Sequence, residues 1–280
     1  MRLRGKNVIL TGASRGIGKI VAQKLDAEGA CLALIARNKK KLEETLTLLS
    51  NKRSFYYVCD ISDEVAVRKI FSEISKKFNK KIDVLINNAG VQYPIGLFVD
   101  NELSVWKDNI KINLFGTINC IKSILPEMIG KKYGKIINLS GGGSTSPRPN
   151  FSAYGVSKTA IVRFTETLAE ELKKMNIDVN AVAPGAINTS MIKEIIDSEK
   201  KAGKEYEEAV IRQKNGGNNP RHVAELITFL SSSLSDGITG KLISAIWDPW
   251  RDSEFQNLLK NDINVSTLRR IDNKYFKGIK

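Results

Sequence analysis

Residues 6–25 read KNVILTGASRGIGKIVAQKL, and this stretch decides the fold class. An apolar run ends at Thr11, a glycine loop follows, and an amphipathic helical pattern begins at Gly16. Glycines at positions 12, 16 and 18 permit a tight turn and let the backbone approach a pyrophosphate, while the N-terminus of the next helix offers free N–H donors. The stretch therefore predicts a strand, a phosphate-binding loop and a helix that together bind a dinucleotide.

Short apolar runs alternate with helical patterns along most of the remaining chain. The runs are CLALIAR, FYYVCD, IDVLINNAG, GKIINLS, IDVNAVAPG and KLISAIW. Their nearly continuous apolar character is typical of strands buried on both faces of a parallel sheet. Strand, helix and strand in repetition predict an α/β fold with a doubly wound parallel sheet and helices on both faces. We expect one Rossmann-fold domain over residues 1–247.

Two regions depart from this alternation. Residues 188–219 are charged and end in a Gly/Asn-rich loop, and we interpret them as helices inserted over a substrate pocket. Residues 248–280 form a basic, weakly periodic extension. The sequence leaves open whether this extension packs on its own subunit, packs on a neighbouring subunit or is partly loose.

The composition is that of an ordinary globular protein, with 42% apolar and 26% charged residues in a chain of 280. No apolar run reaches the roughly 18 residues of a membrane span. The basic N-terminus leads directly into the glycine loop, so we expect neither a signal peptide nor a membrane partner. We expect a cytoplasmic location.

Cys31, Cys59 and Cys120 lie in apolar runs without C-x-x-C spacing, which predicts buried thiols. His222, the only histidine, is expected to be solvated or to cap a helix, and no metal site is predicted.

The chain carries a strong basic excess. Its 44 Lys and Arg residues against 30 Asp and Glu give a net charge of +14. The lysines are scattered near helix ends and loops, so we do not expect a nucleic-acid partner. A basic surface of this kind also steers anionic small molecules or acidic carrier proteins toward the site.

An arginine follows the second apolar run, where NAD-binding sites carry a carboxylate that binds the ribose hydroxyls. Here the run ends Ile35-Ala36-Arg37-Asn38. Arg37 suits a 2′-phosphate instead, and Arg15 in the glycine loop would be a second clamp, because guanidinium groups make charge-assisted hydrogen bonds to phosphate. The sequence therefore predicts NADP(H) as the cofactor in preference to NAD(H).

Tyr154 and Lys158 are spaced one helical turn apart and so share one helix face. A free tyrosine titrates at a pKa of about 10, and a neighbouring ammonium group is expected to lower that pKa. The pair thus predicts a general acid/base of the kind that carbonyl reduction requires.

Six motifs stand in order along the chain: TGASRGIG, Cys59-Asp60, NNAG at 87–90, Asn113, Tyr154-x-x-x-Lys158 and Pro184-Gly185. Together they resemble the compact branch of the short-chain dehydrogenase/reductase family, over residues 5–246. The resemblance implies a seven-stranded Rossmann sheet and an NAD(P)-dependent oxidoreductase that reduces a carbonyl or oxidises the corresponding alcohol. It also implies a homo-oligomer, either dimer or tetramer.

The resemblance also assigns roles to residues. Tyr154 would be the general acid/base, Lys158 would bind the nicotinamide ribose, and Asn113 would position a proton-relaying water. The segments 87–90 and 184–189 would line the cofactor. The cofactor-binding residues it implies are Gly12, Ser14, Arg15, Gly16, Ile17, Gly18, Arg37, Asp60, Ile61, Asn88, Ala89, Gly90, Tyr154, Lys158, Pro184, Gly185, Ile187 and Thr189.

The family's serine is missing, because its position before the tyrosine holds Gly141. Ser140 would take its role if the glycines at 141–143 let the loop adjust, and this is the assignment we prefer. Alternatively, Ser144 or the N–H groups of the glycines hold the developing oxyanion. A third possibility is a catalytically weak NADP(H)-binding regulatory or scaffolding protein.

The substrate is the least determined feature. Arg148 lies between Pro147 and Pro149, which restrict its directions, and with the basic excess it suggests an anionic substrate. Trp247, Trp250 and Arg251 follow the last strand and predict a stacking surface. We expect an anionic carbonyl compound, a keto-sugar derivative slightly ahead of a 3-oxoacyl thioester on a carrier protein.

Overall fold

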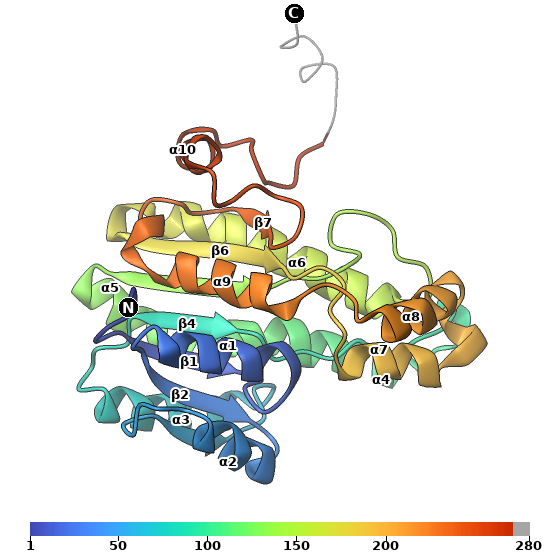
Figure 1. Ribbon diagram of the computed structural model, residues 1–280, viewed down its shortest axis with the longest axis horizontal. Helices are drawn as coiled ribbons and strands as arrows, with labels where there is room; N and C mark the ends of the chain where they lie inside the picture. The colour runs from blue at the N-terminus through green and yellow to red at the C-terminus, as the bar shows by residue number, and fades with distance from the viewer. Residues whose placement is uncertain (271–280) are drawn as a thin grey trace, which may run out of the picture.

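The computed structural model describes residues 1–270. Seven strands form one parallel sheet in the order β3-β2-β1-β4-β5-β6-β7 (Figure 1). The predicted doubly wound sheet is therefore confirmed. The strands are β1 Asn7–Thr11, β2 Cys31–Ala36, β3 Phe55–Val58, β4 Val84–Asn87, β5 Gly134–Leu139, β6 Ile177–Ala183 and β7 Leu242–Ser244.

Helices connect the strands. The α-helices are α1 Gly16–Ala27, α2 Lys39–Thr47, α3 Glu64–Lys77, α4 Leu103–Ile110, α5 Gly116–Lys131, α6 Ser152–Leu172, α7 Ser190–Asp197, α8 Lys204–Asn215, α9 Pro220–Ser231 and α10 Ser253–Asn261. The short 3₁₀ segments are η1 Phe98–Asp100, η3 Lys173–Met175, η4 Glu199–Ala202 and η5 Ser233–Ser235, while η2 Lys111–Phe115 is a π-helix between α4 and α5.

Two apolar cores cover the two faces of the sheet, which explains the continuous apolar character of the strands. On one face α1 and α9 pack together, with Val21, Leu25, Ile227 and Leu230 fully or almost fully buried. On the other face α3, α5 and α6 supply Phe71, Ile124, Leu168 and their neighbours. Cys31, Cys59 and Cys120 are buried thiols, as predicted, and His222 is exposed in the first turn of α9.

From β1 the chain builds the sheet outward through β2 and β3 on one side, and then through β4 to β7 on the other side. The strand order therefore reverses between β1 and β4. In doubly wound sheets the crevice outside the carboxyl ends of the strands at such a reversal is where ligands bind. The loops that leave this edge therefore converge on one end of the molecule; they follow Thr11, Ala36, Val58, Asn87, Leu139, Ala183 and Ser244.

Helices α7 and α8 lie at this end, where the arrowheads of the strands point (Figure 1). They bury an apolar cluster of their own against the start of α6. Its buried members are Phe151, Tyr154, Ile192, Ile195, Ala202 and Ala209. The segment predicted to lie over a pocket is thus helical, and it packs directly on the tyrosine singled out in the sequence.

The chain after β7 returns to its own subunit as far as the structure describes it. Lys241 Nζ donates hydrogen bonds to the carbonyls of Asp262 and Val265, and Leu242 N donates to Ser266 O at 2.7 Å. Leu268 N donates to Glu166 Oε1 at 2.6 Å. The segment thereby covers the outer edge of β7 (Figure 1), an edge that would otherwise be open to strand pairing. The last ten residues of the predicted extension, 271–280, lie outside the described residues.

Residues 1–270 contain no helix with the length and apolar content that crossing a lipid bilayer demands.

Candidate active site

The glycine loop is shaped by close backbone contacts between β1, α1 and the end of β4. Asn88 Nδ2 donates hydrogen bonds to the carbonyls of Thr11 at 2.9 Å and Gly12 at 3.1 Å. A Cβ at Gly12, where φ is +66°, would lie 2.7 Å from Asn88 Nδ2, and a Cβ at Gly18 would lie 2.6 Å from the same atom. Only glycine fits at these two positions, and the loop presents its backbone to the cleft at the start of α1.

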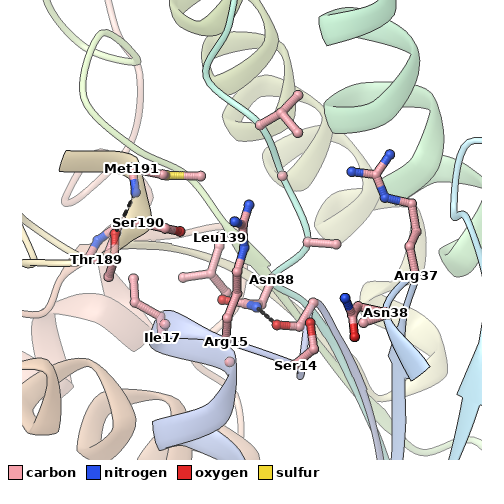
Figure 2. Close-up of a pocket in the computed structure, with 18 of the residues that line it drawn as sticks. Ser14, Arg15, Ile17, Arg37, Asn38, Asn88, Leu139, Thr189, Ser190 and Met191 are labelled. Carbon is pink, nitrogen blue, oxygen red and sulfur yellow. Dashed lines mark hydrogen bonds between the residues drawn. The ribbon is translucent and has the colours of Figure 1, made fainter. Parts of the chain in front are cut away.

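A cleft of about 480 Å³ opens beside this loop (Figure 2). It gathers residues from the carboxyl ends of β1, β2, β4 and β5 and from the start of α7. Most of the residues predicted to bind the cofactor line it: Gly12, Ser14, Arg15, Gly16, Ile17, Gly18, Arg37, Asn88, Ala89, Gly90, Tyr154, Lys158, Pro184 and Thr189. Lining residues that the sequence reasoning missed are Ala36, Asn38, Lys41, Val91, Leu139, Ser190 and Met191.

Four of the predicted cofactor residues do not line this cleft. Asp60 lies beside it and pairs with Arg37 at 3.6 Å. Burial disfavours its charged form, but hydrogen bonds from Ser62 and the charge of Arg37 outweigh burial and lower the pKa of Asp60. Ile61 is buried under α5, where Gly116 leaves room for its side chain. Gly185 and Ile187 line a second cavity instead.

One end of the cleft is rich in cations. Arg37, Asn38 and Lys41 line it, and Figure 2 shows Thr189 to Met191 on the opposite side from Arg37 and Asn38. Arg15 also lines the cleft and forms a loose, exposed ion pair with Glu194 at 3.8 Å. Exposed pairs of this kind hold their partners weakly, so Arg15 and Arg37 are available to an anionic ligand. Lys41 lies in the first turn of α2, directly after Arg37, and this proximity in the sequence could have indicated it as a cofactor-binding residue.

Tyr154 and Lys158 project from the first two turns of α6 into the same region. Both are buried, with 6% and 4% of their surface exposed. Lys158 Nζ donates to Leu139 O at 2.8 Å and lies 5.6 Å from the centre of the Tyr154 ring. Burial lowers the pKa of Lys158 to about 8.

The expectation that Lys158 lowers the pKa of Tyr154 needs correction. Burial dominates and raises the pKa of Tyr154; the opposing charge comes from Arg148, and Glu205 raises the pKa further. The sequence could not show this because the burial comes from α7 and α8, which pack over the ring.

Asn113 sits in the π-helix η2 and is fully buried. Its Nδ2 donates to Val91 O at 2.8 Å, to Asn109 Oδ1 and to Ser157 Oγ, and its Oδ1 accepts from Val91 N at 2.8 Å. The side chain is thus committed to protein partners, and it ties the loop after β4 to α6. Its predicted role in positioning a water stays a prediction.

A family model described as short chain dehydrogenase matches residues 6–200. The chain belongs to the short-chain dehydrogenase family. It is accordingly an oxidoreductase, as the sequence predicted.

Individual relatives match nearly the whole fold. A 3-oxoacyl-[acyl-carrier-protein] reductase of Thermotoga maritima is 34% identical over 246 residues, which cover 87% of this chain and 97% of that protein. A solved NAD+-bound xylitol dehydrogenase is 30% identical with a TM-score of 0.80, covering 87% of this chain and 98% of its own. A solved ElxO variant with NADPH bound is 32% identical with a TM-score of 0.76, covering 86% and 96%. The two structures carry different nicotinamide dinucleotides, so the fold alone does not choose between them.

In this short-chain dehydrogenase, steric contact with Tyr154 explains why position 141 holds a glycine. A Cβ there would lie 3.0 Å from Tyr154 Cζ and closer still to the Tyr154 hydroxyl. The tyrosine hydroxyl occupies the space that a serine side chain would need. The neighbouring Ser140 is 2% exposed, lines the cofactor cleft, and its Oγ has no hydrogen-bond partner within residues 1–270.

Arg148 is not the free anion receptor that the sequence suggested. It makes a two-pronged ion pair with Glu205 of α8, Nε and one terminal nitrogen each 2.5 Å from a carboxylate oxygen. Its guanidinium also lies over the Phe151 ring at 3.9 Å and near the Tyr154 ring at 5.2 Å. The arginine closes the gap between the loop after β5 and α8, and its charge is already matched.

A second cavity of about 710 Å³ adjoins the cofactor cleft. Its lining joins the glycines at 141–143, α7, α8, the loop after β7 and the returning chain at Ser266 and Thr267. Tyr154 lines both cavities. Of the two predicted stacking tryptophans only Trp247 lines this cavity; Trp250 is 4% exposed and packs on Phe229, with Arg251 over its ring.

Proposed function

We propose that this short-chain dehydrogenase is an NADPH-dependent reductase of a ketone, with Tyr154 as the proton donor. The observation that carries the proposal is the position of Tyr154, buried and lining both the cofactor cleft and the adjoining cavity. A group there faces the coenzyme on one side and the substrate on the other.

The cleft fits a nicotinamide dinucleotide. The glycine loop at the start of α1 offers backbone N–H groups to a pyrophosphate, and any side chain at Gly12 or Gly18 would fill the cradle. Bound there, the coenzyme would supply the hydride for reduction. Arg15, Arg37 and Lys41 support a preference for NADP(H), because these three cations would attract its additional phosphate. In addition, the end of β2 carries no carboxylate that would repel that phosphate.

Tyr154 would donate a proton to the substrate oxygen as that oxygen becomes an alkoxide. Its raised pKa keeps the hydroxyl protonated at neutral pH, which favours the reduction direction. Lys158, with a pKa of about 8, is charged at neutral pH and would stabilise the phenolate that remains.

Two donors could hold the substrate oxygen in place of the missing serine. Ser140 Oγ is buried and unpartnered within the described chain, a costly state unless a ligand supplies the partner. The N–H groups of Gly142 and Gly143 also find no protein acceptor among residues 1–270. We favour Ser140, because a buried hydroxyl without a partner requires an explanation that exposed loop amides do not.

The second cavity, which we call the substrate cavity, has a charge distribution that disfavours a strongly anionic substrate. Arg148 and Arg212 face Glu205 and Glu208, and Asp248 adds a further carboxylate. The lining charges therefore leave no uncompensated cation. An uncharged keto-sugar, or a 3-oxoacyl thioester such as the name of the Thermotoga relative implies, fits better than a small phosphorylated or carboxylated ketone.

The deciding experiment measures NADPH consumption by the purified chain with a panel of neutral ketoses, 3-oxoacyl thioesters and anionic ketones. We expect turnover of a neutral ketone and a kcat/KM with NADPH at least about tenfold above that with NADH, a ratio that corresponds to about 1.4 kcal/mol. Arg37→Ala should reduce that ratio without impairing NADH. Tight NADPH binding with no turnover of any carbonyl would instead indicate the regulatory or scaffolding protein.

We further propose a homo-oligomer. Phe115 and Val156 are 54% and 51% exposed, at the end of η2 and in α6, two helices that pack together; exposed large apolar side chains on neighbouring helices are typical of protein interfaces. Light scattering coupled to size-exclusion chromatography should give a mass of two or four chains. A cytoplasmic location remains a prediction from the sequence.

A further inference from the structure

We propose that the returning C-terminal chain builds a subsite for hydroxyl groups at the far wall of the substrate cavity, which makes this reductase selective for polyhydroxylated ketones. The subsite consists of Trp247, Asp248 and Ser266. It rests on the proposed function, because it names the substrate class that Tyr154 would reduce.

The wall is fixed by the sheet and by the returning chain together. Ser244, the last residue of β7, pairs with Ala183 of β6 immediately before Pro184, which lines both cavities. A Cβ at Gly185 would lie 2.6 Å from Ile246 Cγ1, so the chain after β7 passes directly against the loop after β6. Trp247 and Asp248 therefore follow at the carboxyl edge of the sheet, where the substrate cavity opens.

Ser266 reaches the same wall from the far end of the sequence. Its carbonyl accepts the hydrogen bond from Leu242 N at 2.7 Å, which places it beside the first residue of β7. Two hydrogen bonds from Lys241 Nζ hold the preceding residues, Asp262 and Val265. The Ser266 hydroxyl makes no hydrogen bond within residues 1–270, although the residue lines the cavity.

Asp248 offers the subsite an acceptor. Its Oδ2 accepts from Ser244 N at 2.7 Å, and within residues 1–270 its Oδ1 has no donor. A half-buried carboxylate with one unengaged oxygen can accept hydrogen bonds from hydroxyl groups, and it repels carboxylates and phosphates. Both arginines that line the cavity are paired with glutamates, so within residues 1–270 no unpaired lining cation offsets that repulsion.

Trp247 supplies an apolar face beside this acceptor. It is 73% exposed, although it lines the cavity, whereas Trp250 three residues later is buried in the core. Its exposed indole leaves an apolar face that a ligand can cover, and that burial would be favourable. The combination of an aromatic face with a carboxylate and a hydroxyl matches a ring or chain with C–H groups on one side and hydroxyl groups on its edge.

The test compares two ketones that differ in hydroxyl groups, a ketohexose and 2-hexanone, as substrates of four chains with NADPH. The chains are the unmodified protein, Asp248→Asn, Trp247→Ala and the control Glu254→Gln. Glu254 is exposed on α10, lies outside both cavities and loses the same charge as Asp248. Asp248→Asn keeps an oxygen for Ser244 N, so the turn after β7 is preserved.

We expect Asp248→Asn and Trp247→Ala to raise KM for the ketohexose about tenfold each, as for the loss of a hydrogen bond to a charged group or of an aromatic contact. KM for 2-hexanone, and kcat for both ketones, should stay near their original values, and Glu254→Gln should change none of them. Parallel changes for the two ketones, or no change for either, would overturn the subsite.

A failure of the proposed function would look different. If the unmodified chain reduces neither ketone, the subsite is tested by calorimetric binding of the corresponding hexitol. Hexitol binding that is lost in Trp247→Ala and kept in Glu254→Gln supports the subsite, and absence of binding to the unmodified chain overturns it.

Discussion

Gly141 accommodates one side chain, and its two glycine neighbours accommodate another. The hydroxyl of Tyr154 fills the place of a Cβ on Gly141, while the side chain of Arg148 runs past Gly142 and Gly143. A Cβ at Gly142 would be in ordinary contact, 3.7 Å from Arg148 Cδ, but one at Gly143 would lie 3.1 Å from Arg148 Cβ. The glycines thus set the positions of Tyr154, the proposed proton donor, and of the paired Arg148.

The contrast between Gly141 and Gly142 gives a matched pair of variants. Gly141→Ala must displace the Tyr154 hydroxyl, and because a displacement of about 1 Å in a catalytic group costs about 10²-fold in rate, we expect a loss of that size in kcat. Gly142→Ala should keep kcat close to the original value. Steady-state kinetics check both, and NADPH affinity should be unaltered in each. Equal losses in the two variants would mean that the loop, and not the position of Tyr154, sets the rate.

Ser140 and Ser144 provide a second contrast at the same scale. Ser140 Oγ is buried, lacks a partner in the described chain and lines the cofactor cleft beside Tyr154, whereas Ser144 lines only the substrate cavity. If Ser140 holds the developing oxyanion, Ser140→Ala should lower kcat about 10²-fold, the cost of a lost oxyanion donor. Ser144→Ala should stay within a small factor of the unmodified chain. A large effect of Ser144→Ala alone would reassign the oxyanion donor.

At the scale of elements, one ion pair ties α8 to the loop that precedes α6. Arg148 belongs to the loop after β5 and Glu205 to the first turn of α8, and both act on Tyr154, which α7 and α8 bury. Lys158 faces the same ring from α6 itself. The position of α8 therefore bears both on the wall of the second cavity and on the pKa of Tyr154.

The pH dependence of reduction tests whether Arg148 and Glu205 shift the pKa of Tyr154 in opposite directions. Burial raises the pKa of Tyr154, Arg148 lowers it and Glu205 raises it. Reduction needs the protonated hydroxyl, so kcat falls as pH rises through that pKa. Glu205→Gln should move the falling limb to lower pH, and Arg148→Gln should move it to higher pH. Shifts in the same direction would show that the two variants merely loosen α8, and a conservative Arg148→Lys should restore part of the original profile.

At the scale of the whole molecule, the sequence predicts the frame better than the site. Apolar runs such as CLALIAR specify strands buried on both faces, and the glycine loop specifies the strand–helix junction, because both depend on neighbours in the chain. The partners of Arg148 and Tyr154 depend on residues far along the chain, in α7 and α8. Ser266 is a similar case, because no feature of the sequence around it predicts that its carbonyl accepts a hydrogen bond from Leu242.

The proposed function assigns one cavity to the cofactor and the other to the substrate, and a shortened chain tests this division. Within residues 1–270 no residue after Met191 lines the cofactor cleft, whereas Ser266 and Thr267 line the substrate cavity. A chain that ends at Asn261 should therefore bind NADPH with unchanged affinity in a fluorescence titration, while kcat/KM for the ketone falls at least about tenfold as the wall is lost. It should also melt several degrees lower, since the hydrogen bonds from Lys241 and Leu242 go and the edge of β7 is uncovered. The matched control ends at Arg270 and keeps every contact of the wall that the structure describes. Should the shorter chain lose NADPH binding and ketone turnover together, the returning segment supports the fold as a whole and the division into two halves is wrong.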